Sequence, residues 1–141
     1  MFMKIKLFLF IIPCLFFMSC YMEKVAISDG TSLNKNTNII TLNGQWNIIE
    51  KNGSIKIKGQ LPGDVHSALL QAGLIENPYY GDNENKVQWV SDKDWIFKKD
   101  FTLSPQILEY KDIFLDVDCP DTFCEFKING YVVGTSNNMF L

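Results

Sequence analysis

A chain of 141 residues with a formal net charge of −3 has room for one ordinary domain. All 13 basic residues are lysines, they are scattered along the chain, and the carboxylates outnumber them. Arginine supplies the planar fork that contacts phosphates and guanine edges, and the lysines form no basic stripe. The composition therefore excludes nucleic acid from the expected partners.

The first 20 residues predict an export signal. Lys4 and Lys6 provide a positive start, and an apolar run follows from Leu7 to Met18. That run is shorter than the roughly 20 apolar residues that a membrane-crossing helix needs. A cleaved signal peptide over residues 1–20 is therefore favoured over a membrane anchor.

The end of the apolar run resembles the lipobox of bacterial lipoproteins, in which a cysteine is acylated and becomes the first mature residue. Ser19 and Cys20 match it, whereas Phe17 and Met18 are bulkier than usual. The resemblance predicts lipidation of Cys20, membrane attachment through that lipid, and a periplasmic or cell-surface location. The alternative is an ordinary signal peptide cut near Ser19 or Cys20, which would yield a secreted or lysosomal protein.

Residues 21–38 are polar, lack sustained periodicity and predict a flexible tether. The domain is expected over residues 39–141, about a hundred residues, which is small but sufficient for a core. Alternation of apolar and polar residues predicts its strands, at 45–50, 54–58, 87–90, 95–103, 113–118, 123–128 and 131–133. Residues 76–85 are expected to form a loop, because proline, glycine and asparagine recur there.

Two Asn-Gly pairs predict hairpin turns, because these residues tolerate the positive φ that tight hairpins require. They are Asn52-Gly53 and Asn129-Gly130. In the longest predicted strand, Lys99 interrupts the apolar side, which predicts either a β-bulge or a polar patch at that point.

One short helix is predicted between the strands. Its apolar face has the spacing i, i+3, i+4 and i+7 and consists of Val65, Ala68, Leu69 and Ala72. Asp64 can cap its first turn, and Gly73 can end it in the left-handed conformation. About six short strands and one helix predict a mostly antiparallel β-sandwich.

Two cysteines lie outside the predicted signal, Cys119 and Cys124. In an exported protein they are a candidate disulfide across a tight loop, and two free thiols are an equally supported alternative. Their spacing is too wide for a redox Cys-x-x-Cys motif, and the single histidine cannot complete a zinc site. No metal and no other cofactor is therefore expected.

The polar residues that could carry chemistry favour structural roles. His66 is the only histidine, and Ser67, the nearest nucleophile, leaves a different side of the helix. The carboxylate pairs Asp92/Asp94 and Asp116/Asp118 have strand spacing, which is typical of a solvated strand face rather than of a glycosidase acid pair.

The tryptophans are the remaining candidates, because flat aromatic rings stack on sugars. They are Trp46, Trp89 and Trp95. Core packing is favoured over sugar stacking for Trp95, which shares the parity of Phe97, and less strongly for Trp89.

Seven blocks of sequence, in order, resemble the β-mannosidase branch of glycoside hydrolase family 2. The blocks are Leu42-Asn43-Gly44-Gln45-Trp46, residues 61–69, residues 73–84, Gln88-Trp89-Val90 with residues 94–97, Asp121-Thr122, Ile128-Asn129-Gly130 and residues 137–140. Together they cover about the whole of the predicted domain, and an ordered series is far more specific than any single block.

The resemblance implies a galactose-binding-domain-like jelly roll, incomplete at its C-terminal end, that is the first of several domains. In that family a separate barrel domain carries two glutamates, which remove terminal β-mannose residues with retention of configuration. The chain is accordingly expected to be an accessory, sugar-binding domain of an exo-β-mannosidase, without catalytic residues and inactive alone. Its expected partners are a β-mannoside carbohydrate and the barrel domain.

Within the last block, the resemblance assigns substrate contact to Asn138. The chain departs from the family pattern at Asn137, where aspartate is usual, and at Gln88 and Leu141, where arginine is common. Two alternative functions stand beside the accessory domain: a stand-alone lipoprotein module that binds carbohydrate without catalysis, and a nonfunctional remnant.

Overall fold

The protein is mostly β, as expected, and its strands form two facing sheets. The computed structural model describes residues 3–12, 21–28, 38–110, 112–118 and 120–138. The larger sheet has the strand order β10-β9-β1-β6-β4-β5, and every neighbouring pair is antiparallel. Its strands are β10 (Tyr131–Ser136), β9 (Phe123–Ile128), β1 (Met3–Ile12), β6 (Trp95–Leu103), β4 (Gly44–Glu50) and β5 (Lys56–Leu61).

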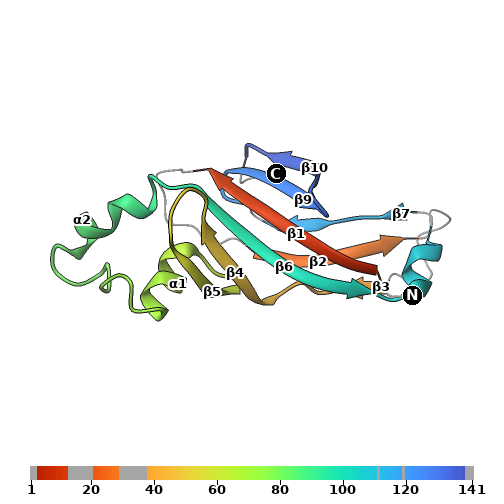
Figure 1. Ribbon diagram of the computed structural model, residues 1–141, viewed down its shortest axis with the longest axis horizontal. Coiled ribbons are helices and arrows are strands. Elements are labelled where there is room, and N and C mark those ends of the chain that lie inside the picture. Colours follow the sequence, from red (N-terminus) through yellow and green to blue (C-terminus); the bar gives the residue numbers. More distant parts are fainter. Residues whose placement is uncertain (1–2, 13–20, 29–37, 111, 119, 139–141) are drawn as a thin grey trace.

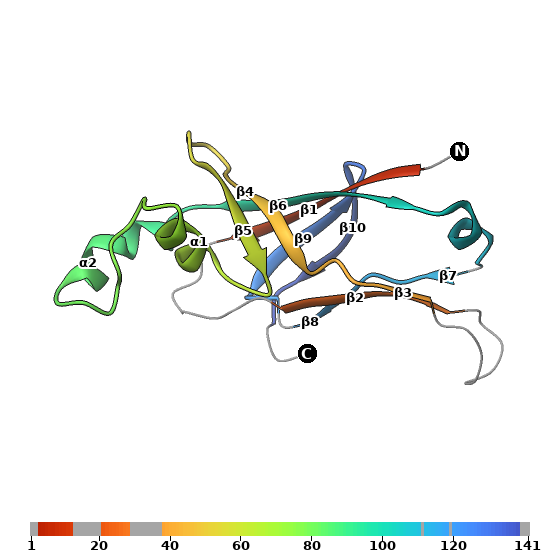
Figure 2. The ribbon, with the colours of Figure 1, turned by 90° about the horizontal axis from the view of Figure 1, so that it is seen from below.

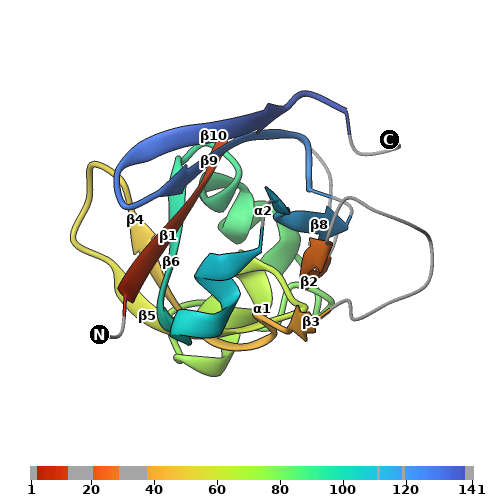
Figure 3. The same ribbon diagram turned by 90° about the vertical axis from the view of Figure 1, so that its right-hand side faces the viewer.

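The smaller sheet lies across the core from the larger one (Figure 2). It consists of β3 (Asn38–Ile40), β2 (Tyr21–Ser28) and β7 (Asp112–Ile113), and β8 (Asp116–Asp118) pairs with β2 as well. Figure 3, which looks along the long axis, shows β2, β3 and β8 on the opposite side from β1, β6, β9 and β10. The predicted β-sandwich is therefore confirmed.

Helical turns occupy the two ends of the molecule (Figure 1). The helices α1 (Val65–Gln71) and α2 (Asn83–Val87), with the 3-10 turn η1 (Gln88–Val90), lie at one end, and the 3-10 turn η2 (Pro105–Glu109) lies at the other. The predicted strand at 87–90 is wrong, because Val87 and Val90 are buried as an i, i+3 pair on successive helical turns. The predicted loop at 76–85 likewise ends in α2.

Two local predictions are confirmed in detail. The Asp64 carboxylate accepts hydrogen bonds from the Ser67 backbone N–H and hydroxyl at 2.8 and 2.7 Å, and Gly73 follows α1 at φ 69°. Asn129 and Gly130 have φ angles of 52° and 90°, so the turn between β9 and β10 is of the tight kind that Asn-Gly favours.

The core between the sheets is built mainly by β4, β5, α1 and β6. Its largest fully buried side chains are Trp46, Phe97, Ile48, Leu61 and Leu69. Trp46 donates its indole N–H to the Leu42 carbonyl at 2.8 Å, so burial leaves this polar atom with a partner.

Lys99 lies on the inward side of β6 without a β-bulge, because β6 pairs continuously with β1 and β4. Its ammonium group donates to the Leu42 and Asn43 carbonyls, each at 2.9 Å, and lies 5.6 Å from the centre of the Trp46 ring. Of the two sequence-based alternatives at this position, the polar patch is therefore the correct one.

Two segments expected to lie outside the domain contribute strands to it. Tyr21–Ser28, within the predicted tether, forms β2, and Met3–Ile12, within the predicted signal, forms β1. Alternating apolar residues serve a strand as well as a leader, and long-range pairing cannot be read from a local pattern. Removal of residues 1–20 is a matter of processing and stays a prediction.

The two edges of the larger sheet differ. β5 carries Lys56 and Lys58 and lies against α1. The other edge, β10, begins with three exposed apolar residues, Tyr131, Val132 and Val133, whose exposed fractions are 79, 54 and 52%.

Candidate functional site

Asn138, the predicted sugar contact, lies just after β10. The Ser136 hydroxyl donates to the Asn138 carbonyl at 3.2 Å, and Asn138 itself is half-buried. Ser136 is in register with Cys124, near the beginning of β9. The turn that carries Asn138 is therefore placed at the end of the β9–β10 hairpin opposite Asn129 and Gly130.

The loop before β9 brings further polar groups to the same end of the sheet. The Thr122 hydroxyl donates to the Asp121 carboxylate at 2.6 Å, and the Cys124 thiol lies 3.8 Å from the Asp121 carbonyl. We call Asp121, Thr122, Ser136 and Asn138 the strand-end cluster. Carboxylate, hydroxyl and amide groups are suited to hydrogen bonding with sugar hydroxyls.

The disulfide prediction has only one described member. Cys124 is buried, with its thiol directed to the Asp121 carbonyl. Cys119 lies outside the described residues, as does Cys20, so the disulfide and the lipidation both stay predictions.

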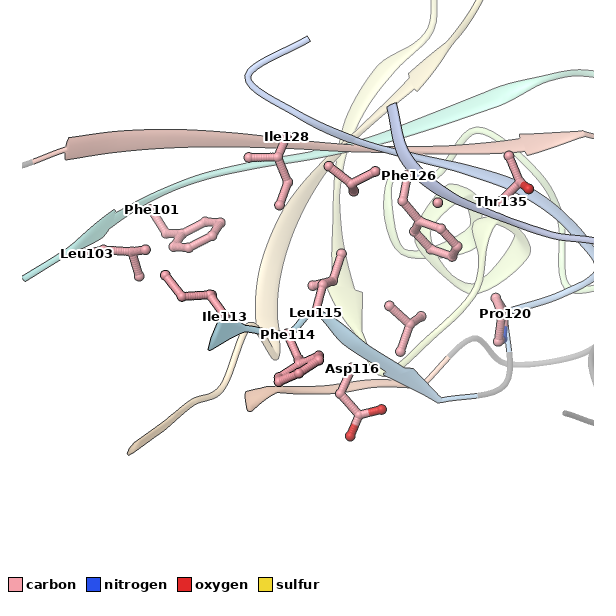
Figure 4. A pocket seen from close by; sticks show the side chains of 13 residues that line it. Phe101, Leu103, Ile113, Phe114, Leu115, Asp116, Pro120, Phe126, Ile128 and Thr135 are labelled. Carbon is pink, nitrogen blue, oxygen red and sulfur yellow. The ribbon is translucent and has the colours of Figure 1, made fainter. Parts of the chain in front are cut away.

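A cavity of about 580 Å³ lies between the two sheets (Figure 4). Phe101 and Phe126 line it from the larger sheet, and Ile113, Phe114 and Leu115 from the β7–β8 segment. Asp116, at its margin, points away from the other labelled side chains. Sugar hydroxyls need hydrogen-bonding partners, so this apolar space does not match a free sugar.

The tryptophans serve the core, as favoured from the sequence. Trp46 and Trp95 are 1% and 2% exposed, and the Trp95 indole N–H donates to the Val90 carbonyl at 2.9 Å. Trp89 is half-buried, and its ring centre lies 6.4 Å from that of Trp95 at a tilt of 47°. Trp89 thus packs on the core and presents only part of its ring to solvent.

His66 and Ser67 both lie in the first turn of α1. The Ser67 hydroxyl donates to Asp64, whose carboxylate caps α1. Burial lowers the pKa of His66, and the nearby Asp64 carboxylate opposes part of that effect. Ser67 therefore serves the N-cap of the helix, and His66 is a partly buried residue of its first turn.

The predicted solvated strand face is confirmed for Asp116 and Asp118, whereas Asp92 and Asp94 lie in the turn between η1 and β6 and not in a strand. The Asp94 carboxylate forms an ion pair with the Lys51 ammonium group at an N–O distance of 3.0 Å. Asp116 and Asp118 are exposed in β8. Within the described parts of the chain, no group of three or more His, Cys, Asp or Glu side chains could hold a metal ion. No helix among the described residues is both long and apolar enough to cross a membrane.

Two exposed tyrosines were not among the candidate binding residues predicted from the sequence. Tyr79 and Tyr80 are 88% and 75% exposed, on the loop between α1 and α2. Asn77 braces this loop, because its side chain accepts from the Tyr79 N–H at 3.0 Å and its carbonyl accepts from the Asn83 side chain at 3.1 Å. The signal was their place between Pro78 and Gly81, where no alternation buries an aromatic ring.

Residues 46–141 match the family model of the glycosyl hydrolase 2 galactose-binding domain-like family. The chain belongs to this family. This match agrees with the resemblance drawn from the sequence blocks, and with the mostly β architecture.

The chain is also similar to curated β-mannosidases. It is 36% identical over 100 residues to β-mannosidase of Mus musculus, which is 71% of this chain and 11% of that protein. It is 31% identical over 103 residues to the probable β-mannosidase of Caenorhabditis elegans, 73% of this chain and 11% of that protein. It is 30% identical over 96 residues to β-mannosidase A of Emericella nidulans, which is 68% of this chain and 10% of that protein.

The chain thus matches about a tenth of the length of these relatives. The family model that matches this chain is that of the N-terminal, galactose-binding-like domain of glycosyl hydrolase family 2. No solved structure matches the chain significantly.

Proposed function

We propose that this chain acts as the N-terminal accessory domain of an exo-β-mannosidase and contributes to sugar binding there without supplying catalytic groups. The observation that carries this proposal is the family match over residues 46–141, together with relatives that are named β-mannosidases and are about ten times longer than the matched segment. The substrate would be a terminal β-mannoside, and the partner a catalytic barrel domain.

The residue proposed to reach the substrate is Asn138. Its backbone carbonyl accepts from the Ser136 hydroxyl, and β10 pairs with β9 through the antiparallel ladder, so the hairpin positions the backbone that carries Asn138. A backbone held in this way has less conformational freedom to lose when the residue binds a sugar hydroxyl. Asp121 and Thr122 stand at the same sheet end and would complete a polar rim.

The first prediction concerns activity. The chain as given should not hydrolyse 4-nitrophenyl β-mannoside, whereas a product in which this domain is joined to a catalytic barrel should do so. In that product Asn138→Ala should lower kcat/KM by about tenfold or more, the loss expected when one hydrogen bond to the substrate disappears.

Asn137→Ala is the matched control, because Asn137 is exposed and adjacent. It should leave kcat/KM within about twofold of the unaltered enzyme, a difference of a few tenths of a kcal/mol. Turnover by the chain alone would refute the accessory role. Equal effects of the two substitutions would refute the assignment of Asn138.

A second candidate function, carbohydrate binding by the chain alone, is favoured by Tyr79 and Tyr80. Exposed aromatic rings on a braced loop can stack on sugars at little entropic cost. Titration with mannobiose, followed by NMR, should then shift resonances of the loop between α1 and α2. Tyr79→Ala should abolish the shifts, and Tyr131→Ala, which removes a comparably exposed ring from the beginning of β10, should not.

Residues 1–20 are proposed to direct export, with lipidation at Cys20. Cys20→Ser should then release the protein from the membrane fraction, because the acyl chains supply the membrane affinity. Unchanged membrane association of this variant would contradict the lipoprotein assignment.

A further inference from the structure

The larger sheet contains a position that a strand fills from outside the matched family domain. β6 and β9 do not pair with each other, because β1 lies between them. β1 pairs with β6 from Met3 to Ile11 and with β9 from Leu7 to Ile12. The family match begins at residue 46, so both neighbours belong to the matched domain and β1 does not.

We propose that β6 and β9 form a strand-acceptor slot, a binding site for an extended peptide, and that Met3–Ile12 is its separable occupant. The proposal concerns binding through backbone pairing and does not rest on the proposed enzymatic function. Its partner chemistry is an extended segment with apolar residues at alternate positions.

The direction of the strands keeps the slot from closing by itself. β1 is antiparallel to both neighbours, so β6 and β9 run parallel to each other. Their spacing across β1 is two strand intervals, about 9.5 Å. Direct pairing would require a movement of about one strand interval, and it would place one parallel ladder in an otherwise antiparallel sheet.

An empty slot would leave two rows of backbone groups without partners in the interior of a sheet. Buried N–H and C=O groups without hydrogen bonds are strongly unfavourable, and an edge of this kind recruits another strand. The slot therefore has a physical demand for an occupant whenever the segment that carries β1 is displaced or removed.

The register defines which peptide fits. Leu9 is in register with Phe97 and Phe126, and Ile11 with Trp95 and Cys124. The four flanking residues are all buried. Every second position of β1 is apolar, as the following series shows: Met3, Ile5, Leu7, Leu9 and Ile11.

The other parity of β1 begins with charge. Lys4 is in register with Thr102, and Lys6 with Asp100, both exposed residues of β6. From Leu7 to Ile12 every residue of β1 is apolar. The expected ligand is therefore apolar at alternate positions throughout, with basic residues at the intervening positions only near its N-terminus. An extended peptide can carry this pattern of side chains. The slot and the apolar cavity between the sheets would therefore take ligands of different kinds.

The test starts from the full chain with a protease recognition sequence placed between residues 13 and 20. After folding and cleavage, the N-terminal fragment should remain bound and co-elute with the rest of the chain in size-exclusion chromatography. A fluorescent peptide of residues 3–12 should replace the bound fragment in the cleaved protein. The fluorescence anisotropy of the peptide should then rise.

The matched control is the same peptide with Leu9→Pro, which removes one backbone N–H at a position paired on both sides. It should bind about tenfold more weakly or worse, since proline both removes a ladder hydrogen bond and disfavours a central strand. Release of the fragment with unchanged amide protection in β6 and β9 would overturn the proposal, as would equal binding of the two peptides.

A second measurement covers the case in which the cleaved chain does not stay folded. In the uncut chain, Leu9→Pro should lower hydrogen-exchange protection in β6 and β9 while the β4–β5 hairpin keeps its protection. Recovery of protection on addition of the 3–12 peptide supports the slot. Failure of the peptide to restore it contradicts the slot.

Discussion

At the scale of single residues, Lys99 shows how a lysine can occupy the inward side of a strand. Lysine combines a long apolar stem with a charged end. The ammonium group of Lys99 reaches two carbonyls more than fifty positions earlier in the chain. Desolvation lowers its pKa, and the carbonyls and the Trp46 ring face compensate for part of the lost hydration. The sequence predicts that Lys99 interrupts the apolar side of the strand. It does not predict which carbonyl groups accept hydrogen bonds from its ammonium group.

His66 gives a pH prediction with a definite sign. Its pKa is lowered in the folded protein by burial, although Asp64 partly opposes the shift. Below the unfolded value of 6.5, the unfolded chain therefore binds a proton that the folded chain does not. The free energy of unfolding should fall as the pH decreases from 6.5 to the lower folded pKa, and should not depend on His66 above that window.

The measurement is urea unfolding at intervals between about pH 7.5 and about pH 5, compared with His66→Gln, which lacks this titration. The unaltered protein should lose more stability than the variant on acidification. Since His66 is the only histidine, its ring resonances report the folded pKa directly. A folded pKa above 6.5 would contradict the assignment.

At the scale of elements, α1 is the part that the sequence specifies most completely. Its beginning and end are confirmed by the contact of Asp64 and the positive φ of Gly73. Its apolar face is confirmed for Val65, Ala68 and Leu69, which are buried, but not for Ala72, which is the C-cap and is exposed. The turn at Asn129 and Gly130 is equally local.

Asp64→Ala should therefore destabilise the protein by about 0.5–2 kcal/mol, because it removes the N-cap acceptor of α1. Asp64→Asn, which retains an acceptor oxygen, should cost clearly less. The difference between the two variants in the midpoint of urea unfolding checks the prediction. Asp64→Ala should also lower the pKa of His66 further, since the carboxylate that raises it is gone.

The elements that the sequence misassigned depend on distant partners. Residues 87–90 form a short apolar run that fits a strand or a helical turn. The helical turn buries Val87 and Val90 together and lets the Val90 carbonyl accept from the Trp95 indole N–H. Residues 3–12 and 21–28 become strands only through pairing with β6, β9, β3, β7 and β8. Local pattern carries no information on such pairings.

The candidate site was predictable only in part. The resemblance pointed to Asn138, but no local feature shows that Asp121 and Thr122 share its end of the sheet, because that proximity arises from the β9–β10 register. The exposure of Tyr79 and Tyr80 likewise follows from the bracing of their loop. Residue type alone does not predict this exposure, since tyrosine is common in cores as well.

At the scale of the whole molecule, the two-sheet architecture follows from patterns that the sequence states plainly. The inward positions of β4 and β6 are occupied by Trp46, Ile48, Trp95 and Phe97, and α1 closes one end of the sandwich with Leu69. The order of the strands is the part that required three dimensions. It is also the part that creates the strand-acceptor slot.

The unequal edges of the larger sheet have a consequence for self-association. At β5, lysine side chains oppose the addition of a strand, whereas at β10 nothing among Tyr131, Val132 and Val133 does so. If two copies paired through their β10 strands, the two outer edges of the combined sheet would both be β5 strands, which carry lysines. Such a contact would terminate at a twofold pair and would not propagate into a fibre.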